Sequence, residues 1–456
     1  MDSPLKKIDD TPKSELEDFK TKTFLISTLH PLDFGVIKID SLPPLDSASD
    51  SDFKKLFLKK CKECYKLCDF SDEKLDVKAK NTKTGFLMEF ETVFTKPRFF
   101  RNIDDEAIAG FIKMAKINIS RALPSFKIVS SIDCPDNVYD ISWPHLNLVY
   151  GDLKALFSGK LMSRVKNDQI ISLIHILIKN SYSSDERERQ SVKDCLSMLY
   201  SKVSDKQIKT KIINSTVNQI RIGLCSAELL GFVYDIVPDI PTLLPDHLED
   251  IYNSVLSLHN SRLYMKFSGA LTQCVTRFIR TKHSLLENTI TFLVKHWPKA
   301  GIKKQVNITS ELESIMQNFA EEPISRECAE SLFQRLGTLF IEPGVDIAEA
   351  ALSFVIGQGN EATLIEYIDL AMKLLIPSLC SCKKKHWNIF IQDDAQIVLD
   401  LLAKVNPPLY KQTLQDIIKS QKDQKINNKE RAKSWALITE MAKKNNPDFT
   451  SDKLKI

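Results

Sequence analysis

Most of this chain consists of segments whose apolar residues recur every three or four positions, and this pattern constrains the fold more than any other feature. Residues 169–180, 247–259 and 285–297 are clear examples. A helix with a single apolar face needs neighbours that bury it. Only 13 of the 456 residues are glycine, below the roughly 7% average. The pattern predicts an all-α fold in which helical hairpins stack into an α-solenoid.

The segment SSDERERQSVKDCLSMLY, residues 183–200, shows the pattern at its sharpest. Its apolar positions at helical spacing are Val192, Cys195, Leu196, Leu199, Tyr200 and Val203. Ser183 and Glu186 fit a capping box, and Asp185, Glu186 and Glu188 place negative charge in the first turn, where the helix dipole favours it. We predict a capped amphipathic helix that buries one face.

Composition divides the chain into three parts. Residues 1–48 are rich in Ser, Asp, Pro and Lys and are predicted to be mostly disordered, residues 49–445 form the solenoid, and 446–456 are a flexible tail. Within the first part, residues 23–39 form either a short extended element or a motif that orders on a partner. The pair His296-Trp297 recurs 90 residues later as His386-Trp387, about twice a HEAT unit of about 40 to 47 residues.

Charge and hydropathy narrow the function classes. The 63 basic and 59 acidic residues give a net charge of +4, which creates no strong field for nucleic acid or an anionic membrane. The N-terminus has no signal-peptide core, and the apolar run 170–178 is too short to span a bilayer. We expect a soluble cytoplasmic protein, with the nucleus also open. The basic stretch 419–433 is either a nuclear import signal or, the favoured interpretation, a solvated helix face.

Cysteine spacing raises the question of metal binding. Cys61, Cys64 and Cys68 form a C-x2-C-x3-C run, which suggests ligands. The same spacing places three small apolar side chains on one face of a helix, and this is favoured because no fourth ligand of comparable spacing follows. Ten scattered cysteines in so long a chain do not form a secreted disulfide framework, so a reducing compartment is expected.

Other chemistry-bearing residues are isolated. Cys380 and Cys382 lie near His386, where a loop leading into a helix is favoured over a metal site. His175 lies inside an apolar stretch and is predicted to be a core histidine. Zinc-protease, phosphate-loop and serine-hydrolase motifs are absent from the sequence. We expect no enzymatic activity, no metal and no cofactor.

Several collinear stretches carry a family resemblance. They are FKKLFLKKCKECYKLCDFSDEKLDVKAKNTK from residue 53, RALP at 121–124, SWPHLNLVYGDL at 142–153, DERER at 185–189, LSLHNSRLY at 256–264, KHWPKAGIKKQVNITSELESIM at 295–316, KKHWN at 384–388 and KERAKSWALI at 429–438. Over about residues 52–440 the chain resembles the B-prime family of regulatory subunits of protein phosphatase 2A.

The resemblance implies a stack of about eight HEAT-like repeats that is not itself an enzyme. It implies a heterotrimer, in which the chain binds a phosphatase scaffold subunit and a phosphatase catalytic subunit and directs them to substrate proteins through short linear motifs. Nucleic acid and membranes are not among the implied partners. The predicted function is therefore a targeting subunit of a protein serine/threonine phosphatase. The alternative is a phosphatase-independent HEAT-repeat adaptor or transport scaffold.

The resemblance also implies a groove, between the third and fourth repeats, that recognises the motif L-x-x-I-x-E. Its positions here are Ser197, Met198, Tyr200, Gln207, Phe232, Ile236 and His247. Family members have His-Arg-x-Tyr where this chain has Ser197 to Tyr200, and an arginine where it has Gln207. Phe232 and Ile236 align with two isoleucines that receive apolar side chains.

The loss of two arginines has a predictable cost for an acidic motif. Each would contribute about 1.5 to 3 kcal/mol through charge-assisted hydrogen bonds, so their loss weakens binding roughly 10²-fold to 10⁴-fold. We expect weak recognition of the usual motif, with any bound peptide depending on its apolar anchors. A second departure is a sparser acidic loop, Asp133, Asp136 and Asp140, which the resemblance places near the catalytic subunit.

Overall fold

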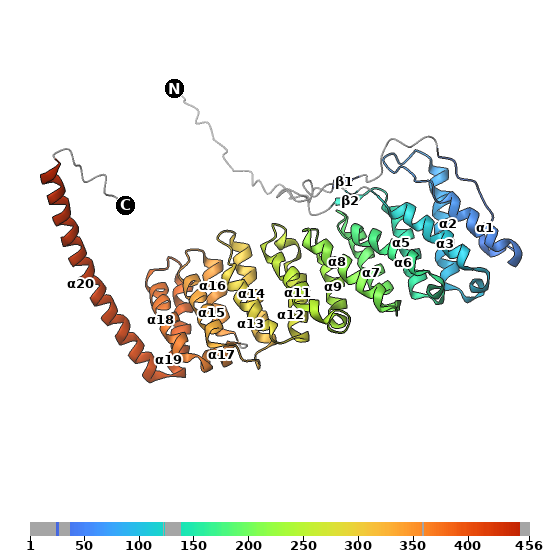
Figure 1. The fold of residues 1–456 in the computed structure, drawn as a ribbon. Coiled ribbons are helices and arrows are strands. Elements are labelled where there is room, and N and C mark those ends of the chain that lie inside the picture. Colours follow the sequence, from blue (N-terminus) through green and yellow to red (C-terminus); the bar gives the residue numbers. More distant parts are fainter. Residues whose placement is uncertain (1–23, 27–36, 122, 124–137, 358–359, 447–456) are drawn as a thin grey trace, which may run out of the picture. The chain divides into compact units, whose positions relative to one another are not determined.

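The computed structural model describes residues 24–26, 37–121, 123, 138–357 and 360–446. They divide into two compact units, Met1–Cys274 and Val275–Ile456, and the helix α12 (Tyr264–Thr281) carries the boundary. Within each unit the helices stack as antiparallel hairpins in two rows, each packing on its neighbours along the chain (Figure 1). This arrangement confirms the predicted all-α solenoid.

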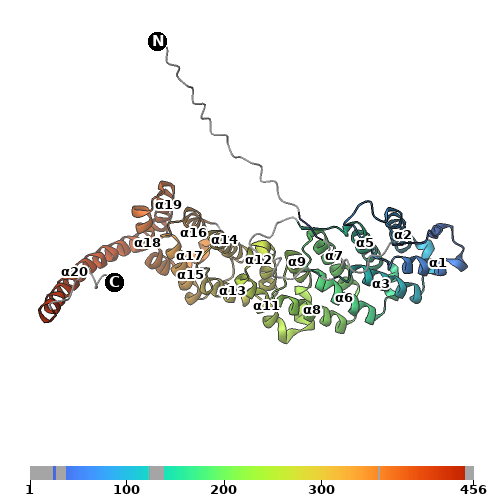
Figure 2. The ribbon, with the colours of Figure 1, turned by 90° about the horizontal axis from the view of Figure 1, so that it is seen from above.

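In unit 1, the long helices before α12 form two rows that run side by side (Figure 2). The first row is α2 (Val77–Thr95), α5 (Trp143–Ser158), α7 (Glu186–Lys202) and α9 (Ala227–Ile236); the second is α1 (Asp50–Glu63), α3 (Asp105–Ile119), α6 (Asn167–Asn180), α8 (Lys206–Arg221) and α11 (Leu248–Leu256). Short turns connect them: η2 (Leu45–Ser47), η3 (Pro97–Asn102), η4 (Lys160–Arg164), η5 (Val237–Asp239), α10 (Ile240–Leu243), η6 (Pro245–His247) and η7 (Ser257–Asn260).

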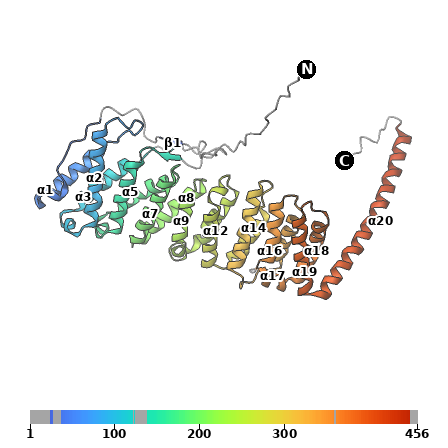
Figure 3. The same cartoon turned by 180° about the vertical axis from the view of Figure 1, so that it is seen from behind.

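The helices of unit 2 are also arranged in two rows. One row is α13 (Leu285–Lys295), α15 (Arg326–Leu339) and α18 (Ile368–Lys385); the other is α14 (Ile302–Asn318), α16 (Val345–Ile356) and α19 (Ile389–Val405), with the short α17 (Glu361–Glu366) before α18. The long helix α20 (Pro407–Asn445) packs its first turns on α18 and α19 and then leaves the stack (Figure 3). The described side chains of 419–433 are exposed on α20, as the solvated-face interpretation predicts.

The recurring His-Trp pair marks equivalent helix ends. His296 follows the last residue of α13, and His386 follows the last residue of α18. In the row between these two helices lies α15. The 90-residue spacing therefore spans two hairpins, which agrees with the predicted repeat length.

The packed part of unit 1 begins before residue 49. Leu45 is buried, and its backbone N–H donates to the carboxylate of Glu89 at 2.8 Å. Farther upstream, β1 (Phe24–Ile26) pairs in parallel with β2 (Val138–Asp140), with Leu25 opposite Tyr139. An extended element is thus present at 24–26, whereas 27–36 lie outside the described residues. At the other end α20 stops at Asn445, and residues 447–456 of the predicted tail 446–456 lie outside the described residues.

The first cysteine cluster is a packing feature. Cys61, Cys64 and Cys68 are all buried, as predicted, but the prediction of a single helix is wrong because α1 ends at Glu63. Burial raises the pKa of Cys64 to about 12, so its thiol stays protonated at neutral pH. Among the described residues, no group of three or more His, Cys, Asp or Glu side chains could hold a metal ion.

Two predictions about isolated residues are wrong. Cys380 and Cys382 lie inside α18, not in a loop, because the apolar period of that helix continues through them to Lys385. His175 is exposed on α6, because the helical period turns its neighbours Leu173 and Leu177 toward the core and His175 away from it. Within the described ranges, no helix combines the length and apolarity that a membrane span requires.

The start of α7 differs from the predicted capping box. The helix begins at Glu186, and the Asp185 carboxylate is the cap, accepting the Arg187 N–H at 3.0 Å. The Ser183 hydroxyl oxygen instead accepts the Asp185 N–H at 3.2 Å. The second oxygen of Asp185 accepts the backbone N–H of Asp140 at 2.9 Å. Asp185 therefore fixes β2 to the helix as well as capping it, a contact that local sequence does not encode.

Behind this cap lies a buried ion pair between Arg121, just after α3, and Glu188 of α7 (2.7 and 2.5 Å). Tyr150 of α5 donates to the same carboxylate at 2.7 Å and accepts from Asn180 of α6 at 3.0 Å. Arg121 also lies 3.3 Å from a carboxylate oxygen of Asp140. Burial alone would lower the pKa of Arg121, but its hydrogen bonds to Glu188 outweigh burial and the pKa is raised. Arg121 therefore stays charged, and its pair with Glu188 links consecutive hairpins.

We expect Glu188→Gln to lower the free energy of unfolding by about 3 to 5 kcal/mol, because it leaves the buried Arg121 charge without its partner. Urea denaturation followed by circular dichroism measures the change. The matched control is Glu186→Gln, at an exposed position two residues away, which should change the value by less than about 0.5 kcal/mol. Equal effects of the two variants would contradict the assigned role.

A buried histidine makes the stability of unit 1 depend on pH. Burial, followed by the nearby Lys83 charge, lowers the pKa of His145 to about 3, against about 6.5 in an unfolded chain. Between these values the unfolded state binds more protons, so the free energy of unfolding falls as pH drops below about 6.5. From pH 7 to pH 5 the wild type should lose about 2 kcal/mol more than His145→Gln.

Urea titrations at several pH values measure this difference. The control is His175→Gln, which replaces an exposed histidine and should keep the slope of the wild type. Parallel curves for the wild type and His145→Gln would show that His145 does not set the pH dependence.

Candidate functional site

The predicted docking groove is centred on Tyr200, in the last turns of α7. The Tyr200 ring meets Phe232 of α9 edge-on, with centroids 6.1 Å apart. Its hydroxyl donates to the carboxylate of Asp239 at 2.9 Å. Burial, and then this bond to Asp239, raise the pKa of Tyr200, so the phenol remains protonated and a donor. The residue that matches the family pattern is therefore already engaged by the chain itself.

Charged neighbours complete this cluster. Lys209 of α8 donates to Asp239 at 3.0 Å, and its ammonium lies 4.4 Å from the centre of the Tyr200 ring. Partial burial opposes ionisation of Asp239, but the bonds from Lys209 and Tyr200 lower its pKa. On the neighbouring turn, the Ser197 hydroxyl donates to Asp235 at 2.8 Å. Two carboxylates therefore lie beside Ser197 and Tyr200.

Sequence reasoning missed Asp235, Asp239 and Lys209. A signal was present, because Asp235 directly precedes Ile236 and Asp239 follows it by three positions. Only the packing of α7 against α9 and the turn that follows it, together with the approach of Lys209 from α8, brings these groups to Ser197 and Tyr200.

The apolar half of the groove is closed. Phe232 and Ile236 have relative exposures of 0% and 1%, so both fill the interface between α7 and α9. The accessible apolar surface that the resemblance implies at these two positions is not present in this structure. A helix in a two-row stack buries the side chains that face its neighbour, and these two lie on that face.

The remaining groove positions lie at the margin. Met198 is half-buried on α7, Gln207 is exposed in the first turn of α8, and His247 is exposed just before α11. Among the described contacts, none joins Gln207 or His247 to the cluster around Tyr200. The structure thus brings Ser197, Tyr200 and Phe232 together with two aspartates and leaves the other predicted positions at the rim.

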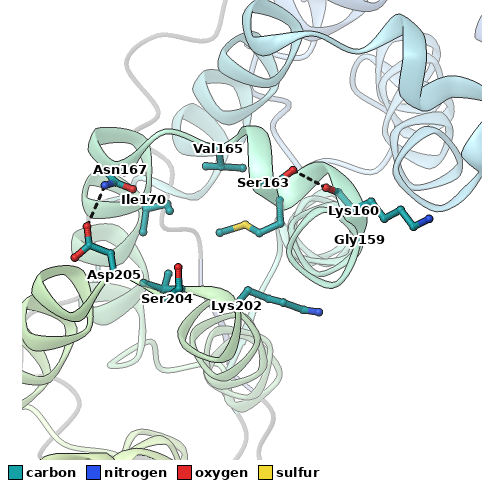
Figure 4. A pocket seen from close by; sticks show the side chains of 11 residues that line it. Gly159, Lys160, Ser163, Val165, Asn167, Ile170, Lys202, Ser204 and Asp205 are labelled. Atoms are coloured by element: carbon teal, nitrogen blue, oxygen red, sulfur yellow. Dashed lines mark hydrogen bonds between the residues drawn. The ribbon is translucent and has the colours of Figure 1, made fainter. Parts of the chain in front are cut away.

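One repeat earlier, a cavity of about 330 Å³ opens between the turn after α5 and the turn after α7. Its side-chain lining includes Met162, Val165, Asn167 and Asp205. Figure 4 shows Asn167 and Asp205 joined on one side, where the amide donates to the carboxylate at 3.2 Å. The other oxygen of Asp205 caps α8 by accepting the Gln207 N–H at 2.8 Å. The acidic group of this cavity is therefore occupied by structural bonds.

The predicted acidic loop is only partly described, since Asp133 and Asp136 lie outside the described residues. Asp140 is buried in β2, with its carboxylate accepting the Ser142 N–H at 2.8 Å and lying beside Arg121. An exposed acidic role is therefore wrong for Asp140, because a carboxylate removed from water must be held by internal donors and charges. It belongs to the buried network of Glu188.

Comparisons with known proteins agree on one family. The model of the protein phosphatase 2A regulatory B subunit, B56 family, matches residues 42–442. The mouse 56 kDa regulatory subunit alpha isoform of serine/threonine-protein phosphatase 2A is 26% identical over 422 residues, covering 89% of this chain and 84% of the relative.

Relatives from other kingdoms match over similar lengths. The theta isoform of the 57 kDa regulatory subunit of the same phosphatase from Arabidopsis thaliana is 25% identical over 402 residues, covering 81% of this chain and 80% of its own. The Schizosaccharomyces pombe 56 kDa regulatory subunit delta 1 isoform is 24% identical over 454 residues, covering 95% of this chain and 81% of the relative. Together with the match of the family model over most of the solenoid, these relatives show that the chain belongs to the B56 family of protein phosphatase 2A regulatory subunits.

Proposed function

We propose that this protein is a regulatory subunit of a serine/threonine phosphatase, which binds the scaffold and catalytic subunits of the enzyme and directs them to substrates. The observation that carries the proposal is the family match across residues 42–442, which includes both rows of helices in each unit. The relatives are named as regulatory subunits. The chain itself would supply no catalysis and would act in the cytoplasm or the nucleus.

Copurification tests this proposal. A tagged full-length chain should bring down one scaffold and one catalytic subunit per copy, and the purified chain alone should hydrolyse no phosphoserine or phosphothreonine peptide. Recovery of the chain without either subunit, under conditions in which a known family member retains both, would favour the phosphatase-independent adaptor.

We also infer that the groove does not recognise an acidic peptide motif. A peptide carboxylate or phosphate near Ser197 and Tyr200 would meet Asp235 and Asp239, and like charges at close range disfavour binding. Lys209 offsets part of this charge, but its ammonium already bonds to Asp239. The apolar anchors of such a peptide would in addition require Phe232 or Ile236 to become exposed.

A gain-of-function variant tests the groove directly. Met198→Arg combined with Gln207→Arg restores two basic groups at the positions that the family pattern indicates. We expect a labelled L-x-x-I-x-E peptide to bind this variant roughly 10²-fold more tightly than the wild type or better, because each restored charge-assisted bond contributes about 1.5 to 3 kcal/mol. Fluorescence anisotropy measures both affinities.

The matched control adds the same charge elsewhere, with Gln190→Arg and Asn214→Arg at exposed positions of α7 and α8. This control should bind the L-x-x-I-x-E peptide no more tightly than the wild type does. A peptide with Gln in place of its final Glu should bind weakly to every variant. Micromolar binding by the wild type that tightens on peptide phosphorylation would contradict the inference.

A further inference from the structure

The strand β2 is held firmly on the start of α7 by side chains from the solenoid. The Asp185 carboxylate accepts the Asp140 N–H at 2.9 Å, and the Arg121 guanidinium lies 3.3 Å from the Asp140 carboxylate. The Arg187 guanidinium lies 4.3 Å from the centre of the Tyr139 ring. Because these contacts fix its backbone, β2 presents a preformed strand edge to any segment that pairs with it.

The strand β1, which occupies this edge, is a weak element by comparison. Its pairing with β2 covers three residues, and among the described residues the sheet has these two strands alone. Two-stranded sheets are marginally stable in water, and parallel sheets normally have both faces covered. The pairing therefore contributes little to folding, and it has the geometry by which an extended peptide adds to a sheet edge.

A cavity of about 330 Å³ opens beside the first residue of β2. Val138 of β2 forms part of its wall, together with Ala227 at the start of α9 and Leu263 and Phe267 at the start of α12. All four residues belong to unit 1. An extended segment paired with β2 would therefore run past a pocket that has an apolar wall.

The charged groups of this cavity balance one another. Arg189 and Glu228 form an ion pair of 2.9 Å between α7 and α9. The other two charged residues of the lining, Glu186 and Lys266, are exposed and have opposite signs. The cavity therefore offers no net charge to a ligand, which favours an uncharged side chain.

The register of the sheet shows which residue of a paired segment reaches the cavity. Residues directly opposite each other in neighbouring strands have their side chains on the same face of the sheet. Val138 lines the cavity, so a peptide residue opposite Val138 would be directed toward it. In the strand of this chain that position is Phe24. The register thus indicates an aromatic residue at the position that the cavity would accept.

We propose that the edge of β2 and the adjoining cavity form a docking site for an extended, apolar segment of another protein, with an aromatic residue opposite Val138. Residues 24–26 of this chain occupy the edge until that segment displaces them. A second copy is disfavoured as the source of the segment. Only residues 27–36 separate β1 from Ile37, whose N–H donates to Asp76 of the same unit at 3.2 Å, so each chain pairs most readily with its own β2.

The first test removes the resident strand from the full-length chain. Neighbouring N–H groups of a strand point to opposite edges, so Leu25→Pro combined with Ile26→Pro removes whichever donor faces β2. The probe is a labelled peptide of residues 20–30, KTKTFLISTLH. It should bind this double-proline variant roughly tenfold more tightly than the wild type, because a tethered strand competes at an effective concentration on the order of millimolar. Fluorescence anisotropy measures both affinities.

The second test examines the cavity. A peptide with Ala in place of Phe24 should bind the double-proline variant about tenfold more weakly, because it loses the burial of an aromatic ring. Adding Ala227→Leu to the variant fills the cavity, and the two peptides should then bind with equal affinity. Equal affinities before the cavity is filled would overturn its assigned role.

The matched control places two prolines upstream of the strand, with Ser14→Pro and Glu15→Pro. It should bind the peptide as weakly as the wild type. Hydrogen exchange followed by mass spectrometry should show faster exchange at residues 138–140 in the double-proline variant and no change in the control. Both should keep the wild-type circular dichroism spectrum. Unchanged exchange at β2, or equal peptide affinities of the wild type and the double-proline variant, would overturn the proposal.

Sedimentation identifies the alternative source of the strand. Concentration-dependent dimers of the wild type that the two prolines abolish would show that copies of this chain exchange their strands. That outcome would overturn the proposal in favour of a second copy. A wild type that remains monomeric at all concentrations supports a segment from another protein.

Discussion

The ion pair of Arg121 and Glu188 is the contact on which the first unit depends most. A solenoid has only nearest-neighbour interfaces, so each junction between hairpins must specify its own alignment. Apolar faces alone tolerate small shifts, whereas two buried charges are satisfied only when their partners meet. Arg121 follows α3, Tyr150 lies on α5, Asn180 ends α6 and Glu188 opens α7, and a single network joins all four.

The same network explains the roles of the DERER segment. Asp185 caps α7 and holds β2 through the backbone of Asp140. Arg187 bonds to Asp185 at 2.7 Å and covers the rings of Tyr139 and Trp143, at 4.3 and 4.9 Å from their centres. Arg189 reaches the next hairpin through Glu228 at 2.9 Å. This charged run at the start of α7 is therefore a set of structural bonds.

The two ends of α7 are thus under different physical constraints. At its start, removal of either partner of an ion pair would leave a buried charge unpaired. The fold therefore restricts which residue types can stand there. At its end, Ser197 and Met198 are half-buried, and substitutions there cost less stability. The fold of the family persists with Asp235 and Asp239 beside Ser197 and Tyr200. Family membership therefore predicts the architecture more firmly than it predicts the peptide that is recognised.

The sequence by itself determined the helices, their order and the two-row stack, because the period of apolar residues is a local property that each segment carries independently. It also indicated the burial of the first cysteine cluster. Only the tertiary structure decided that His175 faces solvent, that Phe232 and Ile236 are closed off, and that Asp140 is a buried partner of Arg121. These outcomes depend on which residues from distant segments meet, and pairing across hairpins is set by packing geometry that no local pattern encodes.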